Sequence, residues 1–347
     1  MISGTIYLPG KKRKEKSIDY PCPCIIMKSF EELSRDFIAY FNKAHFPVHP
    51  ESLYGPAAYF LSLGGKRIRP VMCLMGNELF DEIHPNCWDL ATAIELFHNF
   101  TLIHDDIMDK APLRRGMPTV HEKYSEASAL LAGDVTLVAA YDALNKISVQ
   151  AFHRLLNLFN KTAKEVCEGQ QIDMDYEKSG IVELTEYLRM IELKTSVLLA
   201  ASLKMGAMLG GAGEGNQEHL SEFGRNLGLA FQIQDDYLDA FGDPLKFGKQ
   251  PGGDIMANKK TFLFIKAMEI ASAPVKKEMS LLMKKDGSEK LARMLTIFRD
   301  CGVDREANVL KEEYLAKALS HLESIAVLSV RKEPLKQLAS FLIGRDY

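Results

Sequence analysis

The chain has 347 residues, a net charge of −3 and a hydrophobic fraction of 47%. That fraction is enough for a sizeable core. The small net charge, with basic residues scattered along the chain, argues against nucleic acid as a partner. Six cysteines show no metal-ligand spacing, so we expect free thiols and a cytoplasmic protein. We find no apolar run near the roughly 20 residues of a membrane-crossing helix and expect no membrane span.

The first 26 residues differ from the rest in composition. A basic run at 11–16 precedes a short stretch of alternating proline and cysteine at 21–24. No adequate apolar stretch follows the charges, so this is not a secretory signal. We predict that 1–26 is a disordered extension, or lies upstream of the natural start at Met27, and that 27–347 forms one all-α domain.

From Ser29 onward, apolar residues recur at helical spacing, beginning with Phe30, Leu33 and Phe37. The sequence shows no sustained alternation of the kind that predicts strands. Predicted helices cover about 29–41, 71–86, 88–110, 128–147, 151–175, 183–209, 217–241 and, after 258, most of the remaining chain, with a polar break at 284–288. We predict an all-α fold, a single large helical bundle with one core and a central cavity lined by its helices.

The stretch Gly64–Pro70 reads GGKRIRP and precedes a predicted helix. Its two glycines let the backbone approach an anion, and Lys66, Arg67 and Arg69 follow within four residues. A basic turn is usually only solvated. This combination better fits an oxyanion clamp, because guanidinium groups match phosphate oxygens.

Three acids end the helix predicted over 88–110. Asp105 and Asp109 are four residues apart and share a helix face, with Asp106 beside them. Carboxylates this close repel one another and lose hydration when buried. A cation removes both costs, and carboxylate oxygens with room for water suit Mg²⁺ carrying a phosphate. Arg114 and Arg115 follow in a loop and would bind the rest of a diphosphate.

The same acid spacing recurs at Asp235, Asp236 and Asp239, again after an apolar run that begins with phenylalanine. One such motif is more often a solvated helix face. Two copies, each ending an apolar helix, are hard to attribute to surface charge. Two facing carboxylate clusters could hold several Mg²⁺ ions around one diphosphate.

Further cations lie near these motifs in the sequence. Lys194 sits in an apolar predicted helix, where it either extends to solvent or meets an anion. The Gly- and Pro-rich stretch 242–254 contains Lys246 and Lys249, and we expect it to be a mobile flap beside the acids. Lys259 lies where the next helix begins.

Together these stretches resemble the trans-isoprenyl diphosphate synthase (polyprenyl synthetase) family, short-chain type, over about residues 30–345. The matching motifs are GGKRIRP at 64–70, HDDIMD at 104–109, RRG at 114–116, KT at 194–195, FQIQDD at 231–236 and GK at 248–249. The resemblance implies an α-helical fold, usually as a homodimer. It implies a prenyltransferase that condenses isopentenyl diphosphate with dimethylallyl, geranyl or farnesyl diphosphate and releases diphosphate. It also implies Mg²⁺, three ions per active site, which Mn²⁺ could replace.

The resemblance implies a role for each candidate residue. The direct metal ligands would be Asp105, Asp109 and Asp235, with Asp106, Asp236 and Asp239 beside or behind them. The allylic diphosphate would be held as it leaves by Arg114, Lys194, Lys249 and Lys259, with Gln170 and Asp173 supporting this site. Isopentenyl diphosphate would lie against Lys66, Arg69, His98 and Arg115. Phe231 would stack on that substrate, and Thr195 and Gln232 would lie near the reacting carbons.

A histidine on an apolar helix is more often a structural core residue. His98 lies two turns before Asp105 on nearly the same face, so we favour a substrate contact. His104 and Asp105 also match the pair that begins an HD phosphohydrolase site, but the other histidines have no fitting context. Three alternatives stay open: a terpene cyclase, which would need neither GGKRIRP nor a second acid motif; a non-catalytic partner subunit, in which degenerate acids are expected; and a phosphate-ester hydrolase.

Product length is predicted from the residues before the first acid motif. Thr101, Phe100 and Phe97 lie four, five and eight residues before Asp105. At about 1.5 Å per residue they fall roughly 6, 7.5 and 12 Å along the helix. In the resembled family an aromatic at the fifth position marks short-chain enzymes. We therefore expect farnesyl or geranylgeranyl diphosphate as product, with C20 slightly favoured and Phe97 able to shorten the pocket toward C15.

Overall fold

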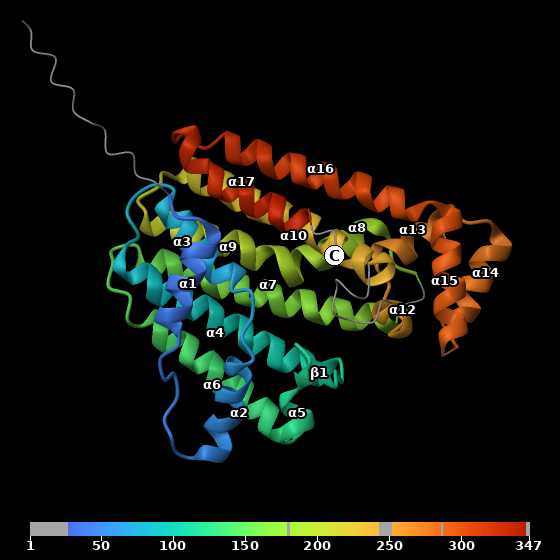
Figure 1. Cartoon of the computed structure of the whole chain (residues 1–347), viewed down its shortest axis with the longest axis horizontal. Coiled ribbons are helices and arrows are strands. Elements are labelled where there is room, and N and C mark those ends of the chain that lie inside the picture. Colours follow the sequence, from blue (N-terminus) through green and yellow to red (C-terminus); the bar gives the residue numbers. More distant parts are fainter. Residues whose placement is uncertain (1–26, 179–180, 243–251, 286, 345–347) are drawn as a thin grey trace, which may run out of the picture.

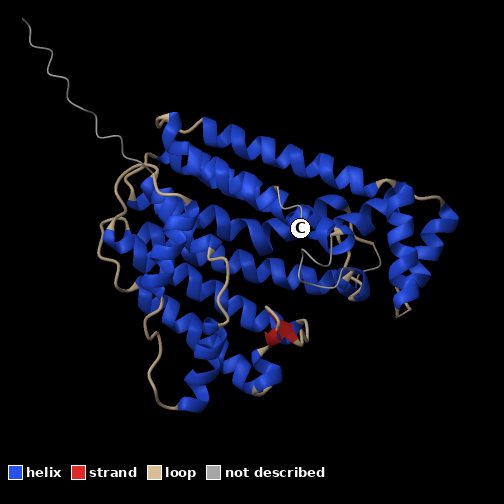
Figure 2. Ribbon diagram, in the orientation of Figure 1, coloured by secondary structure: helices blue, strands red, loops and turns tan. Residues whose placement is uncertain are grey.

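The computed structural model describes residues 27–178, 181–242, 252–285 and 287–344. The predicted extension 1–26, Lys246, Lys249 and most of the predicted flap lie outside these ranges. Within them the chain is helical, as predicted (Figure 2). Its strands in the described ranges are Leu113–Arg114 (β1) and Met117–Pro118 (β2), which pair as an antiparallel hairpin. Strands of two residues are too short to show a period in the sequence.

The helices follow one another along the chain with short connections. In order they are α1 (Phe30–Phe41), α2 (Glu51–Ser62), α3 (Ile68–Glu78), α4 (Pro85–Met108), α5 (Val120–Lys123), α6 (Glu126–Leu144), α7 (Phe152–Lys178), α8 (Leu184–Ile191), η1 (Glu192–Ser196), α9 (Val197–Leu209), α10 (Glu214–Phe241), α12 (Gly253–Met256), α13 (Phe262–Ile270), α14 (Ala273–Leu282), α15 (Ser288–Cys301), α16 (Val303–Glu323) and α17 (Ser329–Ile343).

Most boundaries follow local signals. Ser29 caps α1 through a capping box with Glu32, and Pro85 occupies the first turn of α4. The helix predicted over 71–86 is shorter than expected. It ends at Glu78 because the Asn77 side chain accepts a hydrogen bond from the His84 backbone at 2.8 Å and shapes a turn. The helix predicted over 183–209 is interrupted by η1, a π-helical turn.

The long helices run roughly alongside one another (Figure 1). Helix α10 packs on α9 and α16, α4 packs on α3 and α6, and η1 packs on α7 and α10. The prediction of one core is wrong in detail, because the buried side chains form three clusters. The largest involves α1, α3, α4, α9 and α10, a second gathers around α8, α13 and α15, and a small third lies under α2, α5 and α6.

Helix α6 departs from the expectation that no segment could span a membrane. Its length and composition suffice for a span, and 44% of it is buried. Core helices of soluble proteins meet the same criteria, and α6 packs on α4 and α2. Its outer face carries Leu130, Leu131, Val138 and Tyr141, between 40% and 60% exposed. We call these four residues the α6 face.

Candidate active site

The two acid motifs end α4 and α10, and both divide their acids in the same way. The second acid of each motif is buried: Asp106 is 1% exposed and Asp236 is 4% exposed. The remaining acids are partly or largely exposed: Asp105, Asp109, Asp235 and Asp239. Successive helical residues point about 100° apart, so one motif can present acids to a cavity and bury another.

Asp106 holds the loop that carries the arginines. Its Oδ1 accepts hydrogen bonds from Nε of Arg114 at 2.9 Å and from Nη2 at 2.5 Å. Burial raises the pKa of Asp106, and the Arg114 guanidinium opposes this rise. The β1–β2 hairpin is thereby fixed at the end of α4 with Arg114 beside the first acids.

Asp236 of α10 joins its helix to α8 and α13. It accepts hydrogen bonds from the Tyr187 hydroxyl at 2.5 Å, from the Gln232 amide at 3.1 Å and from the Phe262 backbone at 3.2 Å. Burial and the nearby Asp254 carboxylate raise the pKa of Asp236 to about 7, despite these donors. Sequence reasoning missed Tyr187 of α8, because a lone tyrosine in a helix carries no local signal.

The third acid of the second motif, Asp239, positions the chain segment that returns to the site. Asp239 accepts a hydrogen bond from the Asp254 backbone at 3.0 Å, at the start of α12. Nζ of Lys259 then lies 4.0 Å from an Asp109 oxygen and 3.9 Å from an Asp254 oxygen, bridging the two ends of the site. Burial alone would lower the pKa of Lys259, but Asp254 and Asp109 outweigh it and raise the pKa. Asp254 is a further acid that sequence reasoning did not single out.

The π-helical turn η1 presents Lys194 and Thr195. Nζ of Lys194 lies 2.5 Å from Asp173 of α7, and the Thr195 hydroxyl donates to Gln232 at 3.2 Å. The turn packs closely on α7 at Gly169, where an added Cβ would lie 2.3 Å from the Lys194 backbone nitrogen. Such π-helical insertions are frequent at functional sites.

These elements enclose one small cavity of about 90 Å³. Six of the residues predicted from sequence line it: Asp173, Lys194, Thr195, Gln232, Asp236 and Lys259. The two residues that sequence reasoning missed, Asp254 and Tyr187, line it as well. Burial raises the pKa of Asp105 at the neighbouring end of α4 to about 6, with Lys194 opposing the rise. The site thus places lysines opposite crowded carboxylates.

A second cavity of about 340 Å³ gathers the four residues predicted for isopentenyl diphosphate: Lys66, Arg69, His98 and Arg115. The Arg69 guanidinium lies 3.0 Å from Nε2 of His98. Burial lowers the pKa of Arg69 to about 10, and Glu95 and Asp105 counter this. Nε of Arg69 is buried and has no hydrogen-bond partner among the described residues, as expected of a group that awaits an anion.

The glycines of GGKRIRP allow Arg115 to approach the backbone of this loop closely. Arg115 donates to the Gly64 carbonyl oxygen, and an added Cβ at Gly65 would lie 2.7 Å from the Arg115 guanidinium. Gly65 has a φ of 136°, which side-chain-bearing residues rarely adopt. The loop from α2 and the hairpin after α4 are therefore interlocked at the cation-lined cavity.

Behind this clamp lies a buried ion pair that sequence reasoning missed. The side chains of Arg67 and Glu95 are 5% and 3% exposed, and Nη1 of Arg67 donates to Glu95. Asn99 also donates to the Glu95 carboxylate, at 2.9 Å. Among the residues that line the 340 Å³ cavity, Glu95 is the acidic one.

The predicted chain-length residues Phe97 and Phe100, together with His104, lie on the side of α4 away from the clamp. His104 bonds to the Leu130 carbonyl of α6 at 3.1 Å, and an added Cβ at Gly133 would lie 2.2 Å from its ring. Phe100 packs edge-on against His104 at 4.8 Å, and Phe97 packs on Phe159 at 5.4 Å. His104 therefore joins α4 to α6, which disfavours the phosphohydrolase alternative.

The other predicted residues are not among the described residues that line the two cavities. The Thr101 hydroxyl donates to the His98 carbonyl at 2.8 Å. Gln170 of α7 is 8% exposed and its amide lies 3.9 Å from the sulfur of Met108. Phe231 is partly buried against the largest core cluster. Lys249 lies outside the described residues.

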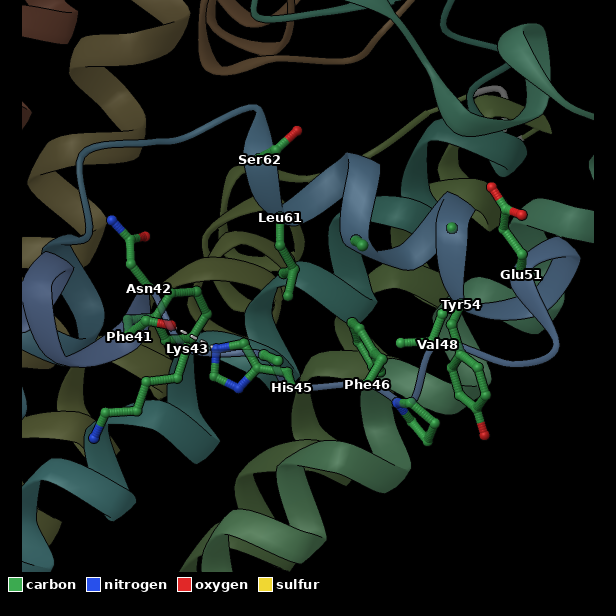
Figure 3. A pocket seen from close by; sticks show the side chains of 14 residues that line it. Phe41, Asn42, Lys43, His45, Phe46, Val48, Glu51, Tyr54, Leu61 and Ser62 are labelled. Atoms are coloured by element: carbon green, nitrogen blue, oxygen red, sulfur yellow. Dashed lines mark hydrogen bonds between the residues drawn. The ribbon is translucent and has the colours of Figure 1, made fainter.

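A separate pocket of about 330 Å³ lies between the end of α1 and α2 (Figure 3). Aromatic side chains, Phe41, Phe46 and Tyr54, form much of its wall, and Nε2 of His45 bonds to the Phe41 carbonyl. The Arg67 guanidinium lies 5.0 Å from the centre of the Phe41 ring, so this pocket backs onto the buried ion pair. None of the predicted site residues lines it.

The donor set suits Mg²⁺ brought with a diphosphate. Within the described ranges, no group of three or more His, Cys, Asp or Glu side chains is close enough to hold a metal by itself. Mg²⁺ commonly takes one or two carboxylates, with substrate phosphates and water completing an octahedron. Asp105, whose pKa is raised mainly by burial, fits this pattern with Asp109 and Asp235.

Comparisons with known proteins agree with this geometry. The family model described as polyprenyl synthetase matches residues 50–299. A geranylgeranyl diphosphate synthase of Methanosarcina mazei is 40% identical over 303 residues, 86% of this chain and 92% of that protein. A short chain isoprenyl diphosphate synthase of Methanothermobacter thermautotrophicus is 34% identical over 324 residues, 93% of this chain and 98% of that protein. A crystal structure of geranylgeranyl pyrophosphate synthase superposes with a TM-score of 0.87 at 40% identity, covering 92% of this chain and all of that one. The chain therefore belongs to the polyprenyl synthetase family.

Proposed function

We propose that the protein condenses isopentenyl diphosphate with allylic diphosphates to give geranylgeranyl diphosphate. The carrying observation is a pair of cavities that are both lined by cations. The cavity of about 340 Å³ is lined by Lys66, Arg69, His98 and Arg115, and the cavity of about 90 Å³ by acids and lysines. Each suits a diphosphate. The acid that lines the larger cavity, Glu95, is paired with Arg67, whereas the smaller cavity offers several carboxylates for a metal. Two such sites match a reaction that joins two diphosphate substrates and expels one diphosphate.

The residues of the 90 Å³ cavity, which is lined by acids and lysines, would bind and stabilise the allylic diphosphate. When bound, Mg²⁺ would neutralise the charge that develops on this leaving group. Lys194, Lys259 and Arg114 provide fixed cations at the same place, so little reorganisation is needed as the C–O bond breaks. Their present carboxylate partners, Asp173 and Asp106 among them, keep these side chains oriented before substrate arrives.

The residues of the 340 Å³ cavity, Lys66, Arg69 and His98 among them, would hold isopentenyl diphosphate with its double bond toward the allylic carbon. The new C–C bond forms as electrons of that double bond attack the allylic cation, and a proton then leaves the adjacent carbon. The departing diphosphate is the proposed acceptor of this proton. Thr195 and Gln232 line the cavity of about 90 Å³ and would lie near the reacting carbons, and apolar walls would keep water from quenching the cation.

Product length would be set along α4 below Asp105. Phe100 is partly buried and packs at 5.8 Å from Phe97, so the two rings form a layer across the path proposed for the growing chain. Phe100→Ala should lengthen the product by at least one isoprene unit, and adding Phe97→Ala should lengthen it further. If both variants stop at the wild-type length, another helix or a partner subunit forms the floor.

The protein would act as a homodimer through the α6 face. Exposed apolar residues that gather on one side of a helix are typical of an interaction site. Leu130 and Leu131 lie about two helical turns before Val138, and Tyr141 lies about one turn after it, so the four follow one side of α6. Val138→Glu should yield a monomer in sedimentation experiments, and a protein that is monomeric before substitution would contradict the proposal.

Product analysis tests the proposed function directly. The protein is incubated with Mg²⁺, labelled isopentenyl diphosphate and each allylic diphosphate, and the products are sized. We expect C20 diphosphate, whereas a cyclase would release hydrocarbon, a hydrolase would release phosphate without elongation, and a non-catalytic subunit would give neither. Asp105→Ala should reduce turnover about a thousandfold or more, with the exposed Asp300→Ala as control. Condensation that survives EDTA would contradict the metal requirement.

A further inference from the structure

The segment from Gly252 to Lys259 delivers two charged residues to the active site. It carries Asp254 and Lys259, and Lys259 lies within 4.0 Å of oxygens on both Asp109 and Asp254. On the active-site side, α10 holds the segment. Asp239 accepts a backbone hydrogen bond from Gly252 at 2.5 Å and another from Asp254 at 3.0 Å.

The opposite side of the segment rests on α15, a peripheral helix beside α12 (Figure 1). Lys290 of α15 is 1% exposed, and its ammonium donates to Oδ1 of Asn258 at 2.7 Å and approaches the Met256 carbonyl at 3.4 Å. The next residue, Leu291, packs so closely on Gly252 that an added Cβ would lie 2.2 Å from it. Two successive residues of α15 therefore support both ends of α12.

The partner of Lys290 occupies a decisive position in the backbone. Asn258 has a φ of 60°, a left-handed conformation that costs energy for residues other than glycine and is best tolerated by asparagine and aspartate. Its backbone bonds to Ile255 at 3.2 Å, and the Lys259 backbone bonds to Asp254 at 2.9 Å. The direction in which Lys259 leaves the turn therefore depends on Asn258 keeping this conformation.

A buried ammonium needs a structural reason, because removing a lysine charge from water is costly unless hydrogen bonds replace the lost hydration. The stem of Lys290 could be replaced by an apolar side chain of equal length if packing were its only role. Its bonds to Met256 and Asn258 instead end on the turn that precedes Lys259.

We propose that Lys290 is a positioning residue for the allylic diphosphate site. It fixes Asn258 in its left-handed conformation, and thereby holds Lys259 toward the first acid motif and Asp254 beside Asp239 of the second. This inference rests on the proposed function in assigning Lys259 to the allylic substrate. It adds a residue of a peripheral helix to the machinery that binds this substrate.

Lys290→Met tests this role, with Lys332→Met as the matched control. Lys332 of α17 is also buried, at 4% exposed, and its ammonium donates to the Glu323 carbonyl at 2.7 Å, at the end of α16. Steady-state kinetics should show the KM for the allylic diphosphate raised about tenfold in Lys290→Met, with the KM for isopentenyl diphosphate within about twofold of wild type. Lys332→Met should change neither KM.

Substitution of Asn258 keeps the inference testable if Lys290→Met does not fold. Asn258→Asp retains an acceptor for Lys290 and tolerates a positive φ, so it should behave as wild type. Asn258→Gly retains the backbone conformation but removes the acceptor, so it should reproduce the tenfold effect. The double variant Lys290→Met, Asn258→Gly should be no worse than either single variant.

Calorimetric titration with inorganic diphosphate and Mg²⁺ gives a readout independent of turnover. Binding should weaken about tenfold in Lys290→Met and stay unchanged in Lys332→Met. The inference is overturned if Lys290→Met and Lys332→Met behave alike, or if both KM values change equally. If the wild-type protein elongates no prenyl chain, the proposed function fails, and diphosphate binding still decides the role of Lys290.

Discussion

Glu95→Gln should destabilise the protein strongly although it preserves the shape of the side chain. The change leaves the Arg67 guanidinium, 5% exposed, without its charged partner. Removing one partner of a buried ion pair typically costs about 3–5 kcal/mol. Arg67 would keep its contact with the Leu61 carbonyl at 3.4 Å and with the Phe41 ring. We therefore expect a loss near the lower end, about 3 kcal/mol.

Equilibrium unfolding in urea measures this loss, and a double variant separates the pair from its surroundings. Arg67→Met with Glu95→Leu replaces both charges by apolar groups, which is often close to neutral for buried pairs. We expect the double variant to be more stable than Glu95→Gln alone. As a surface control, Arg293→Met breaks the exposed pair with Glu278 and should leave the midpoint unchanged. Equal losses for the buried and surface pairs, or a double variant worse than Glu95→Gln, would refute the reasoning.

The remaining predictions concern substrate selectivity, the N-terminal residues and pH. Arg69→Ala should raise the apparent KM for isopentenyl diphosphate more than that for the allylic substrate, because Arg69 lies with His98 in the cation-lined cavity; the opposite pattern in steady-state kinetics would mean that the two sites are exchanged. A chain that starts at Met27 should keep its circular dichroism and product profile, and loss of solubility on truncation would contradict this. In EDTA the free energy of unfolding should fall as pH rises from about 4 to about 7, because Asp236, with its pKa raised from 3.8 to about 7, retains in the folded state a proton that the unfolded chain has lost. Urea titrations across this range should show the slope, and Asp236→Asn should reduce it, leaving the part due to Asp105, whose pKa is raised to about 6.

The parts of the site that could be predicted from sequence have local signatures. The acids at the ends of α4 and α10 follow apolar helical periodicity, and the glycines of 64–65 precede a cluster of cations. Both patterns occupy fewer than about ten residues, so secondary structure alone brings each group together. The structure then places Lys66 and Arg69 with His98, and Lys194 with Asp173, as the motifs suggested.

The residues that were missed depend on contacts between distant segments. Glu95 meets Arg67 across 28 positions, Tyr187 meets Asp236 across 49, and Lys290 meets Asn258 across 32. None of Glu95, Tyr187 and Lys290 belongs to a local motif, so each looks in the sequence like an ordinary position on a helix. The π-helical turn at Lys194 was missed for the same reason, because its cause is the close approach of α7 at Gly169.

The shared spacing of the two acid motifs has a geometric consequence that the acids' charge alone does not explain. The residue next to the first acid cannot share the side of the helix that residues four places apart occupy together, since each residue advances about 100°. The first and last acids share a side, so the second acid must face elsewhere, and in both motifs it is buried. Asp106 uses this position to hold Arg114, and Asp236 uses it to hold Tyr187 and the start of α13. A buried carboxylate with fixed donors sets the rotation of its helix about the axis. The second acid thus determines where the neighbouring acids point, and the same four-residue spacing supplies both the groups for a metal and the anchor that aims them.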